Sequence, residues 1–342
     1  MPRVLYGVSP IGLGHATRAL VILQELKLRG ADVCVFSGGK AADFLRQNGV
    51  TVEAIVDDPV PTVIKGEMRR VALWYIRSWL ANRRTITRTE RLFDDIKPDL
   101  VVCDEEFSGL VVAGRRGIKR VFITDELLLG FARTWLARKI EQRVERWYRR
   151  LQDSVDMLIV PEFGTDSGNR RFVGPIVRAQ TQNCPEVRSK HKLPGGTMVL
   201  FSMSGSGIGR DLALGVADSL KDAKLKGAFL VVTGNRGHSL SGEGIFDLGL
   251  VPDNQNLVAC SDLVVSTAGK STIDEAAAAG TPIVVIPIKH HAEQERNAKA
   301  LGYSSDDAGR LNDIISQKMG QRNTPRRFTG EIAASDAIMS LT

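Results

Sequence analysis

The sequence predicts an α/β protein with two domains, each a parallel β-sheet covered by helices. Three observations lead to this fold class: a length of 342 residues, two runs of alternating strand and helix patterns, and an irregular stretch between the runs. One hydrophobic core rarely grows to fill a chain of this length, so two domains are expected. Strands that alternate with helices form parallel sheets, because each helix returns the chain to the same edge.

The two runs can be followed along the chain. Short apolar segments between turn residues predict strands at residues 4–8, 32–36, 52–56, 100–103, 120–124 and 157–160, and then at 198–202, 228–232, 263–265 and 283–286. Residues 161–185 are rich in Gly, Pro, Asn and Asp, which is typical of a linker. We therefore expect a first domain at residues 1–168, a second at 169–328, and a last helical stretch at 329–342.

Composition and cysteine spacing narrow the class of protein. The chain is 43% hydrophobic and 25% charged, as a soluble globular protein would be. It has no apolar run of the ~18 residues that a membrane span needs, and residue 3 runs straight into a strand without a signal peptide. Cys34, Cys103, Cys184 and Cys260 lie far apart, which argues against a zinc site or a disulfide scaffold. A reduced, cytoplasmic protein is expected.

The net charge of +7 is concentrated in two segments. Residues 69–91 carry +6 and residues 133–150 carry +5, so the rest of the chain is net acidic. In a helix, Arg70, Arg77, Arg84 and Arg91 would form a stripe opposite Ala72, Tyr75, Trp79 and Ile86. Cationic stripes edged by Trp suit an anionic membrane surface, although solvated helix faces are the plain alternative. We assign Arg70, Trp74, Arg77, Arg84, Trp135, Lys139 and Arg143 to an acceptor or membrane surface. No nucleic-acid motif accompanies them, so no nucleic-acid partner is expected.

A glycine turn follows the first strand. Gly12 and Gly14 allow close backbone approach at the start of a helix, and His15 and Arg18 come directly after them. As a dinucleotide fingerprint the turn is poor, because Thr17 replaces the third glycine and the second strand ends in Ser37-Gly38-Gly39 without an acid. A nicotinamide enzyme is therefore disfavoured.

The stretch 267–297 is the most informative part of the chain. It predicts a small-residue turn, a helix that Gly280 stops, the strand at 283–286, and another helix. Gly269-Lys270-Ser271 resembles the end of a phosphate-binding P-loop, but Val264 stands where that motif requires glycine. The spacing that remains is Gly269, then Glu275, then Glu293-Gln294 and Asn297.

This spacing resembles the donor-binding segment of GT-B glycosyltransferases of the family 28 and family 1 group. That group includes the bacterial N-acetylglucosaminyltransferase of peptidoglycan synthesis and the UDP-glycosyltransferases. Residues 12–18 are similar to its G-x-G-H-x-x-R turn, and residues 174–178 to its G-P-x-x-R hinge entry. The resemblance implies two Rossmann-like domains that face each other across a cleft, with the last helix packed back on the first domain.

The resemblance also implies a nucleotide-sugar site. Glu275 would hold the ribose hydroxyls, and Glu293-Gln294 the sugar hydroxyls, because carboxylates accept strong hydrogen bonds from diols. Backbone amides at a helix start would bind the negatively charged pyrophosphate without a metal ion, since the chain has no Asp-x-Asp motif. No cofactor is expected beyond the nucleotide-sugar co-substrate, with UDP as the nucleotide. The donor-binding residues are then Gly14, Ser204, Gly205, Ser206, Thr267, Gly269, Lys270, Ser271, Thr272, Glu275, His291, Glu293 and Gln294.

His15 is the candidate general base, because an imidazole near its free pKa can take a proton from an acceptor hydroxyl. Asp104 and Asp125, which follow predicted strands on the same sheet edge, are the candidate orienting acids. The alternative is that His15 caps the helix or binds phosphate. The expected activity is inverting, metal-independent transfer of a hexose or N-acetylhexosamine to a lipid-linked or membrane-proximal acceptor, in the cytoplasm or at the inner face of the cell membrane. A UDP-sugar 2-epimerase of the same architecture and a non-catalytic sugar-binding subunit are the alternative functions.

Overall fold

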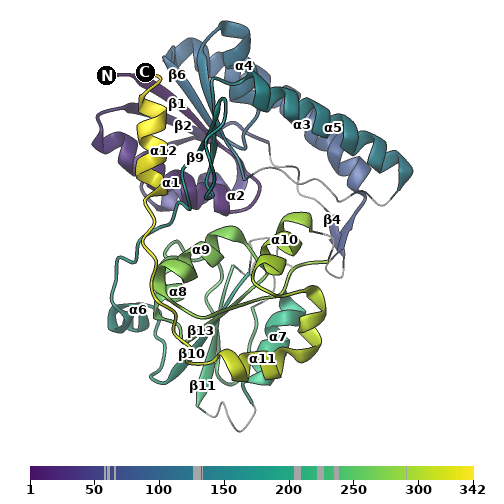
Figure 1. Ribbon diagram of the computed structural model, residues 1–342, viewed down its shortest axis with the longest axis vertical. Coiled ribbons are helices and arrows are strands. Elements are labelled where there is room, and N and C mark those ends of the chain that lie inside the picture. The colour runs from purple at the N-terminus through teal and green to yellow at the C-terminus, as the bar shows by residue number, and fades with distance from the viewer. Residues whose placement is uncertain are drawn as a thin grey trace. The chain divides into compact units, whose positions relative to one another are not determined.

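The computed structural model describes residues 1–57, 59, 62–64, 67–125, 132, 134–203, 209–221, 227–234, 239–289 and 291–342. The chain divides into two compact units. The first unit contains Met1–Thr62, Met68–Val177 and Phe328–Thr342, and the second contains Val63–Glu67 and Arg178–Arg327. Each unit is built on one parallel sheet with helices on both faces (Figure 1).

Within the described residues, the sheet of the first unit has seven parallel strands in the order β3-β2-β1-β6-β7-β8-β9. Its strands are β1 (Arg3–Val8), β2 (Asp32–Ser37), β3 (Val52–Ala54), β6 (Leu100–Asp104), β7 (Lys119–Ile123), β8 (Met157–Val160) and β9 (Arg170–Phe172). Its helices are α1 (Gly14–Leu28), α2 (Gly39–Gln47), α3 (Val71–Ile96), α4 (Ser108–Arg116), α5 (Trp135–Ser154) and α12 (Gly330–Met339). Strands β4 (Thr62–Ile64) and β5 (Glu67–Arg69) pair as a separate two-stranded sheet.

Alternate residues of β1 serve the two faces of this sheet, as the two-residue period of a strand requires. Val4, Tyr6 and Val8 pack under α1, α2 and α12, while Leu5 packs with residues of α3, α4 and α5 on the other face. Because helices cover both faces, the central strands are apolar throughout. Polar side chains at the ends of these strands therefore extend from a sheet that is packed on both faces.

The second unit contains, in its described part, five parallel strands in the order β12-β11-β10-β13-β14. They are β10 (Thr197–Ser202), β11 (Ala228–Thr233), β12 (Ile245–Asp247), β13 (Leu263–Ser266) and β14 (Ile283–Val285). The helices are α6 (Cys184–Lys190), α7 (Arg210–Ser219), α8 (Asn254–Cys260), α9 (Lys270–Ala279), α10 (Ala292–Ala300) and α11 (Leu311–Lys318), with a 3-10 helix at Ser305–Arg310. Helices α7 and α11 pack on one face, and α6 and α8 on the other.

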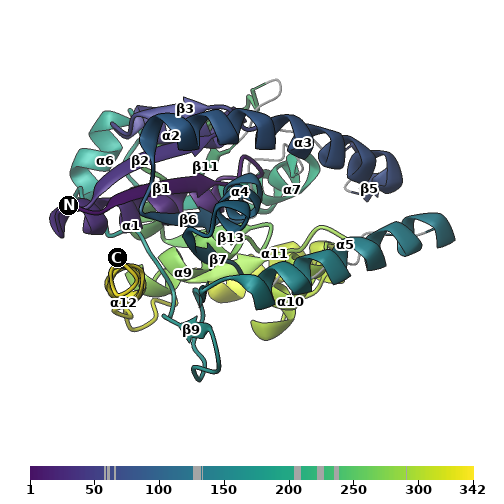
Figure 2. The same ribbon diagram turned by 90° about the horizontal axis from the view of Figure 1, so that it is seen from above.

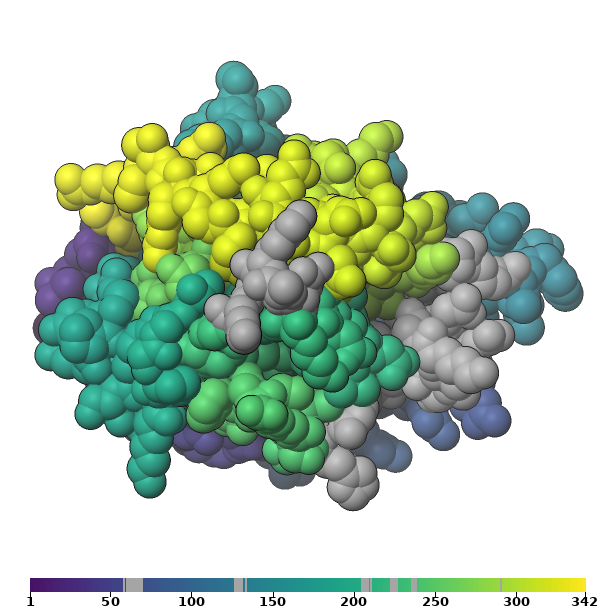
Figure 3. Space-filling model, turned by 90° about the horizontal axis from the view of Figure 1, so that it is seen from below, coloured from purple at the N-terminus to yellow at the C-terminus, as the bar shows by residue number. Residues whose placement is uncertain are grey.

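After α11 the chain continues in the second unit as far as Arg327, within the yellow part of Figure 3. Backbone bonds from Asn323 to Gly280 O and from Arg326 to Ala277 O tie it to the end of α9. Gly280 has a φ of 69°, and a Cβ there would lie 2.4 Å from Asn323 O. Only glycine fits this close approach.

Both sheets reverse their strand order beside their first strand. β1 lies between β2 and β6, and β10 lies between β11 and β13. Ligands of open α/β sheets bind at the carboxyl ends of the strands at such a reversal. In the first unit this point lies between the ends of β1 and β6, and in the second between the ends of β10 and β13.

The last helix completes the first unit. α12 lies beside α1 (Figure 1), and Arg29, the C-cap residue of α1, forms an ion pair with Asp336 of α12. The first unit continues to Val177, beyond the expected boundary at residue 168, because β9 pairs with β8.

The cysteines depart from the expectation of a reduced protein. Cys184 and Cys260 form a disulfide that links α6 to α8, with their Cα atoms 5.2 Å apart. Cys34 and Cys103 are free. Spacing along the sequence argued against such a pair, but it is the packing of α6 against α8 that brings the two residues together.

Candidate functional site

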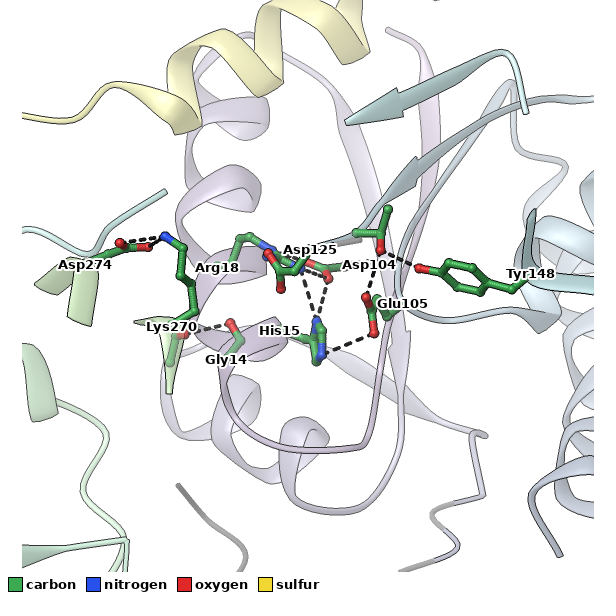
Figure 4. A network of polar contacts seen from close by, with 11 residues as sticks. Gly14, His15, Arg18, Asp104, Glu105, Asp125, Tyr148, Lys270 and Asp274 are labelled. Atoms are coloured by element: carbon green, nitrogen blue, oxygen red, sulfur yellow. Dashed lines mark hydrogen bonds and ion pairs between the residues drawn. The ribbon is translucent and has the colours of Figure 1, made fainter. Parts of the chain in front are cut away.

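In the first unit, the glycine turn after β1 leads into α1 without a side-chain cap. Gly12 has a φ of 78°, and the N-cap residue Leu13 makes no side-chain bond to the first amides of the helix. His15 lies in the first turn of α1 and Arg18 one turn later. Figure 4 shows both side chains directed at the end of β6, where Asp104 and Glu105 lie.

The His15 ring lies between two carboxylates. Its Nδ1 atom is 2.8 Å from Asp104 Oδ1, and its Nε2 atom is 3.8 Å from Glu105 Oε2 (Figure 4). The Asp104 side chain is fully buried as the last residue of β6, and Glu105 is 13% exposed. A histidine held by a buried carboxylate on one nitrogen has a fixed ring orientation.

Arg18 supplies the positive charge that stabilises the neighbouring carboxylates. Its Nε donates to Asp104 Oδ2 at 2.8 Å and its Nη2 to Asp104 Oδ1 at 2.5 Å. Its Nη1 donates to Asp125 Oδ1 at 2.6 Å. Of the two expected orienting acids, Asp104 therefore contacts His15, whereas Asp125 contacts Arg18.

The electrostatics leave His15 charged. Burial by itself would lower the pKa of His15, but the hydrogen bond to Asp104 and the charges of Asp104 and Glu105 raise it to about 9. Burial would raise the pKa of Asp104, yet Arg18 and His15 hold it below its usual value. At neutral pH the His15 ring of the free protein is therefore protonated. The sequence alone predicts instead an imidazole with a pKa near its free value.

Glu105 is a member of this group that the sequence analysis did not single out. Its Oε1 accepts a hydrogen bond from Thr124 Oγ1 at 2.9 Å, and Tyr148 Oη lies 2.5 Å from the same Thr124 oxygen (Figure 4). The available signal was the run of three acids at residues 104–106, directly after a predicted strand.

In the second unit, a strained turn joins β13 to α9. Ala268 has a φ of 63°, a conformation that residues with a side chain rarely adopt. Asn297 Nδ2 donates to Ala268 O at 3.1 Å and fixes the turn. Gly269 is the N-cap of α9 and supplies no side-chain bond. No N-cap side chain therefore bonds the first turn of α9, and a helix start of this kind at the carboxyl edge of a sheet suits an anion.

Glu275 lies on α9 and is 5% exposed. Arg178 Nε and Nη2 both donate to Glu275 Oε1 at 3.1 Å, and Arg178 Nη1 donates to Pro252 O at 2.7 Å. Burial raises the pKa of Glu275 above its usual value, and the positive charge of Arg178 offsets only part of this effect. The arginine of the G-P-x-x-R segment thus holds the carboxylate that was expected to bind ribose.

The other donor residues expected in the second unit lie at the start of α9, at the start of α10, or outside the described residues. Lys270 pairs with Asp274 at 2.5 Å, as Figure 4 shows, while Thr267 is buried and Ser271 and Thr272 are half-buried in the first turn of α9. His291 caps α10 by accepting from Gln294 N, and burial lowers its pKa. Gln294 Oε1 accepts from Ile288 N at 3.0 Å, and Glu293 lies half-buried in the first turn of α10. Ser204, Gly205 and Ser206 lie outside the described residues.

Helices α3 and α5 carry the basic segments and extend beyond the sheet together (Figure 2). Tyr75 of α3 donates to Glu141 of α5 at 2.9 Å, and both side chains are buried. The exposed cations include Arg77, Arg84, Lys139 and Arg143. Lys139 Nζ lies 5.1 Å from the ring centroid of Trp135, which is 70% exposed.

Three details of α3 differ from the expected stripe. Arg70 is the N-cap with a φ of 54°, so the helix begins one residue after it. Trp74 is half-buried and donates its Nε1 to Pro59 O at 2.7 Å. Trp79, expected opposite the arginines, is 58% exposed. The same two helices expose other large apolar side chains: Leu73, Ile76 and Leu80 on α3, and Leu136 on α5.

Within the described part of the chain, no helix is both long and apolar enough to cross a membrane.

Two family models match the chain. The model described as Glycosyltransferase family 28 C-terminal domain matches residues 211–310, within the second unit. The model described as Glycosyl transferase family 1 matches residues 2–145, within the part that holds His15 and Asp104.

Relatives match over most of the chain. An uncharacterized glycosyltransferase of Methanosarcina mazei is 26% identical over 87% of this chain and 84% of its own length. A UDP-N-acetylglucosamine--N-acetylmuramyl-(pentapeptide) pyrophosphoryl-undecaprenol N-acetylglucosamine transferase of an Exiguobacterium species is 26% identical over 84% of this chain and 81% of its own length. Among solved structures, the spinosyn rhamnosyltransferase SpnG complexed with thymidine diphosphate has a TM-score of 0.61 at 15% identity, over 99% of this chain and 96% of that one.

Proposed function

We propose that this chain, which belongs to the family 28 and family 1 group of GT-B glycosyltransferases, transfers a hexose or N-acetylhexosamine from a uridine diphosphate sugar to a hydroxyl group. The proposal depends above all on one observation. His15 and the buried Asp104 meet at 2.8 Å where the strand order of the first sheet reverses.

On the acceptor side, His15 acts as the general base. Asp104 holds Nδ1, so Nε2 takes the proton from the acceptor hydroxyl as its oxygen attacks the anomeric carbon of the sugar. The bond from that carbon to the diphosphate oxygen breaks, and the nucleoside diphosphate leaves. One direct displacement inverts the anomeric configuration. His15 must first lose its own Nε2 proton, so the reaction needs the neutral imidazole.

On the donor side, the diphosphate binds at the start of α9. The uncapped amides and the helix dipole stabilise the charge that develops on the leaving group, with no metal required. Glu275, oriented by Arg178, accepts the ribose hydroxyls, and Glu293 and Gln294 contact the sugar. The name of the peptidoglycan relative supports uridine and an N-acetylhexosamine donor, and the thymidine diphosphate complex of SpnG supports a nucleoside diphosphate in general.

Calorimetry with UDP and Glu275→Gln tests the donor site. We expect at least tenfold weaker UDP binding, because the amide accepts diol hydrogen bonds more weakly than the carboxylate. Glu293→Gln is the matched control, since the diphosphate alone lacks the sugar that Glu293 contacts. Equal UDP affinity in Glu275→Gln and the unmodified protein would remove Glu275 from the site.

His15→Gln tests the base. Loss of a general base typically lowers the rate about 10²–10⁴-fold, while UDP affinity stays the same because His15 does not contact the nucleotide. The protein is also incubated with UDP-N-acetylglucosamine in the absence of an acceptor, and NMR of the products shows whether an epimerised sugar has formed. Full transfer activity in His15→Gln would exclude His15 as the general base. An epimerised product formed without acceptor would show that the protein is an epimerase and overturn the proposed transferase function.

We propose further that the α3–α5 pair contacts an anionic membrane surface, which brings a lipid-linked acceptor to the site. Arg83 lies over the ring of exposed Trp79 and Lys139 over the ring of exposed Trp135, and Leu80 of α3 is exposed as well. Flotation with vesicles of phosphatidylcholine, with and without phosphatidylglycerol, tests this. Binding should require the anionic lipid and fall in Arg77→Glu/Lys139→Glu, whereas Lys299→Glu on α10 is the control. Flotation that does not depend on lipid charge would contradict the proposal.

A further inference from the structure

His15 has a carboxylate on each side of its ring, which a simple base does not need. Asp104 holds Nδ1, so Nε2 is left to receive the acceptor proton. Glu105 Oε2 faces this same atom at 3.8 Å, a distance beyond a direct hydrogen bond but within strong electrostatic reach. The Nε2 side is therefore already occupied by a negative group in the free protein.

The Glu105 carboxylate is held there by three different elements. Its backbone has a φ of 45°, which is rare for a residue with a side chain and directs the side chain back toward α1. Thr124, after β7, donates to Oε1 at 2.9 Å, and Tyr148 of α5 bonds the same threonine. Tyr148 is itself 4% exposed and packs edge-on against Phe122.

The neighbouring Glu106 provides a contrast. It is more deeply buried, at 3% exposed, and its oxygens accept from Ser108 N, Ser108 Oγ and Gly109 N at the start of α4. Glu106 therefore stabilises a helix end, whereas the bonds of Glu105 place a carboxylate against His15.

We propose that Glu105 is a positioning residue of the transfer reaction, a second carboxylate that holds the Nε2 side of His15 until an acceptor hydroxyl takes its place. The proposal rests on the role of His15 as the base. When the acceptor hydroxyl gives its proton to Nε2, the imidazolium that forms is again flanked by Asp104 and Glu105. Among the described residues, the charged groups that face His15 are Asp104 and Glu105 at the end of β6, Arg18 on α1, and Asp125 through Arg18.

Titration of the free protein by histidine NMR tests the proposal without any turnover. The chain has five histidines, and the His15 signal is the one that His15→Gln removes. Glu105→Gln should lower the pKa of His15 by about one unit, because a negative charge beside the imidazolium is lost. Glu106→Gln is the matched control and should leave the pKa of His15 unchanged while lowering the melting temperature.

A second variant keeps the test decisive if Glu105→Gln folds poorly. Thr124→Val removes the hydroxyl that holds Glu105 and should lower the pKa of His15 in the same direction by a smaller amount. A pKa of His15 that is unchanged in either folded variant would overturn the proposal. With donor and acceptor present, the pH profile of kcat/KM should shift with the NMR value, and Glu105→Asp should restore part of the shift. Failure here leaves the His15→Gln result standing, so the two proposals fail separately.

Discussion

The charge of His15 makes the reaction pH-dependent at the scale of a single residue. With the pKa raised to about 9, most of the free protein has the protonated ring at pH 7, which cannot act as a base. We expect kcat/KM to rise about tenfold per pH unit between pH 6.5 and 8.5 and to level off near pH 9. Initial rates across this range, with UDP affinity measured at the same pH values, check the prediction. A profile that is flat above pH 6.5 would contradict it.

Residue patterns predicted one half of this group and missed the other. His15 was found because it belongs to the glycine turn that follows the first strand, and Asp104 because it directly follows the predicted strand at 100–103. The ends of neighbouring parallel strands meet at one edge. The partner of Glu275 was not found, since Arg178 is 97 positions away and only folding brings it near. Glu105 was missed because the run of acids at residues 104–106 does not tell which side chain faces His15. Its φ of 45°, which contributes to its orientation, is not readable from the sequence.

At the scale of elements, the apolar strands were predictable, including the short edge strands β3 and β14, whereas the edge strands β9 and β12 were not. β9 and β12 have three residues each, Arg170–Phe172 and Ile245–Asp247, and their sequences lack a strand pattern. They form because a neighbouring strand offers a free edge. The exposed face of α3 was assigned from periodicity alone, and Trp79 shows that periodicity does not tell which side chains of a helix are buried.

The disulfide between α6 and α8 gives a prediction at the same scale. It closes a loop with a sequence separation of 76 residues, which in the chain-entropy account stabilises the folded state by about 2–4 kcal/mol. Cys184→Ser should lower the free energy of unfolding by this amount, and Cys34→Ser should change it little because Cys34 is free. Urea unfolding measures both variants. Two reactive thiols per denatured, unreduced chain are expected, and four would show that the pair does not form.

At the scale of the whole molecule, α12 belongs to a unit from which it is separated in sequence by the second unit. Ile338 is fully buried among residues of the first core, whereas Ile332 on the same helix is 41% exposed. We expect Ile338→Ala to cost about 2–4 kcal/mol and Ile332→Ala less than about 1 kcal/mol. Calorimetric unfolding should show the loss in the transition of the first unit. Equal effects of the two substitutions would mean that α12 does not pack on the first core.

The charge of the whole molecule is unevenly distributed along the chain. The two basic helices lie in the first unit, and the excess of acid lies in the rest of the chain. This difference was visible in the sequence, because it needs only the positions of charged residues. The exposure of Trp79 and Leu80 was not, because it depends on how α3 packs in the folded protein.

The arrangement of α12 also has a consequence for synthesis on the ribosome. The helix follows Arg178–Arg327 in the chain, so the outer face of α1 has no cover until the second unit has been made. During that interval the nascent first unit exposes the apolar surface that Ala334 and Ile338 later bury. Since domains tend to fold as they emerge, the second unit would finish folding before the first, in the reverse of their order of translation.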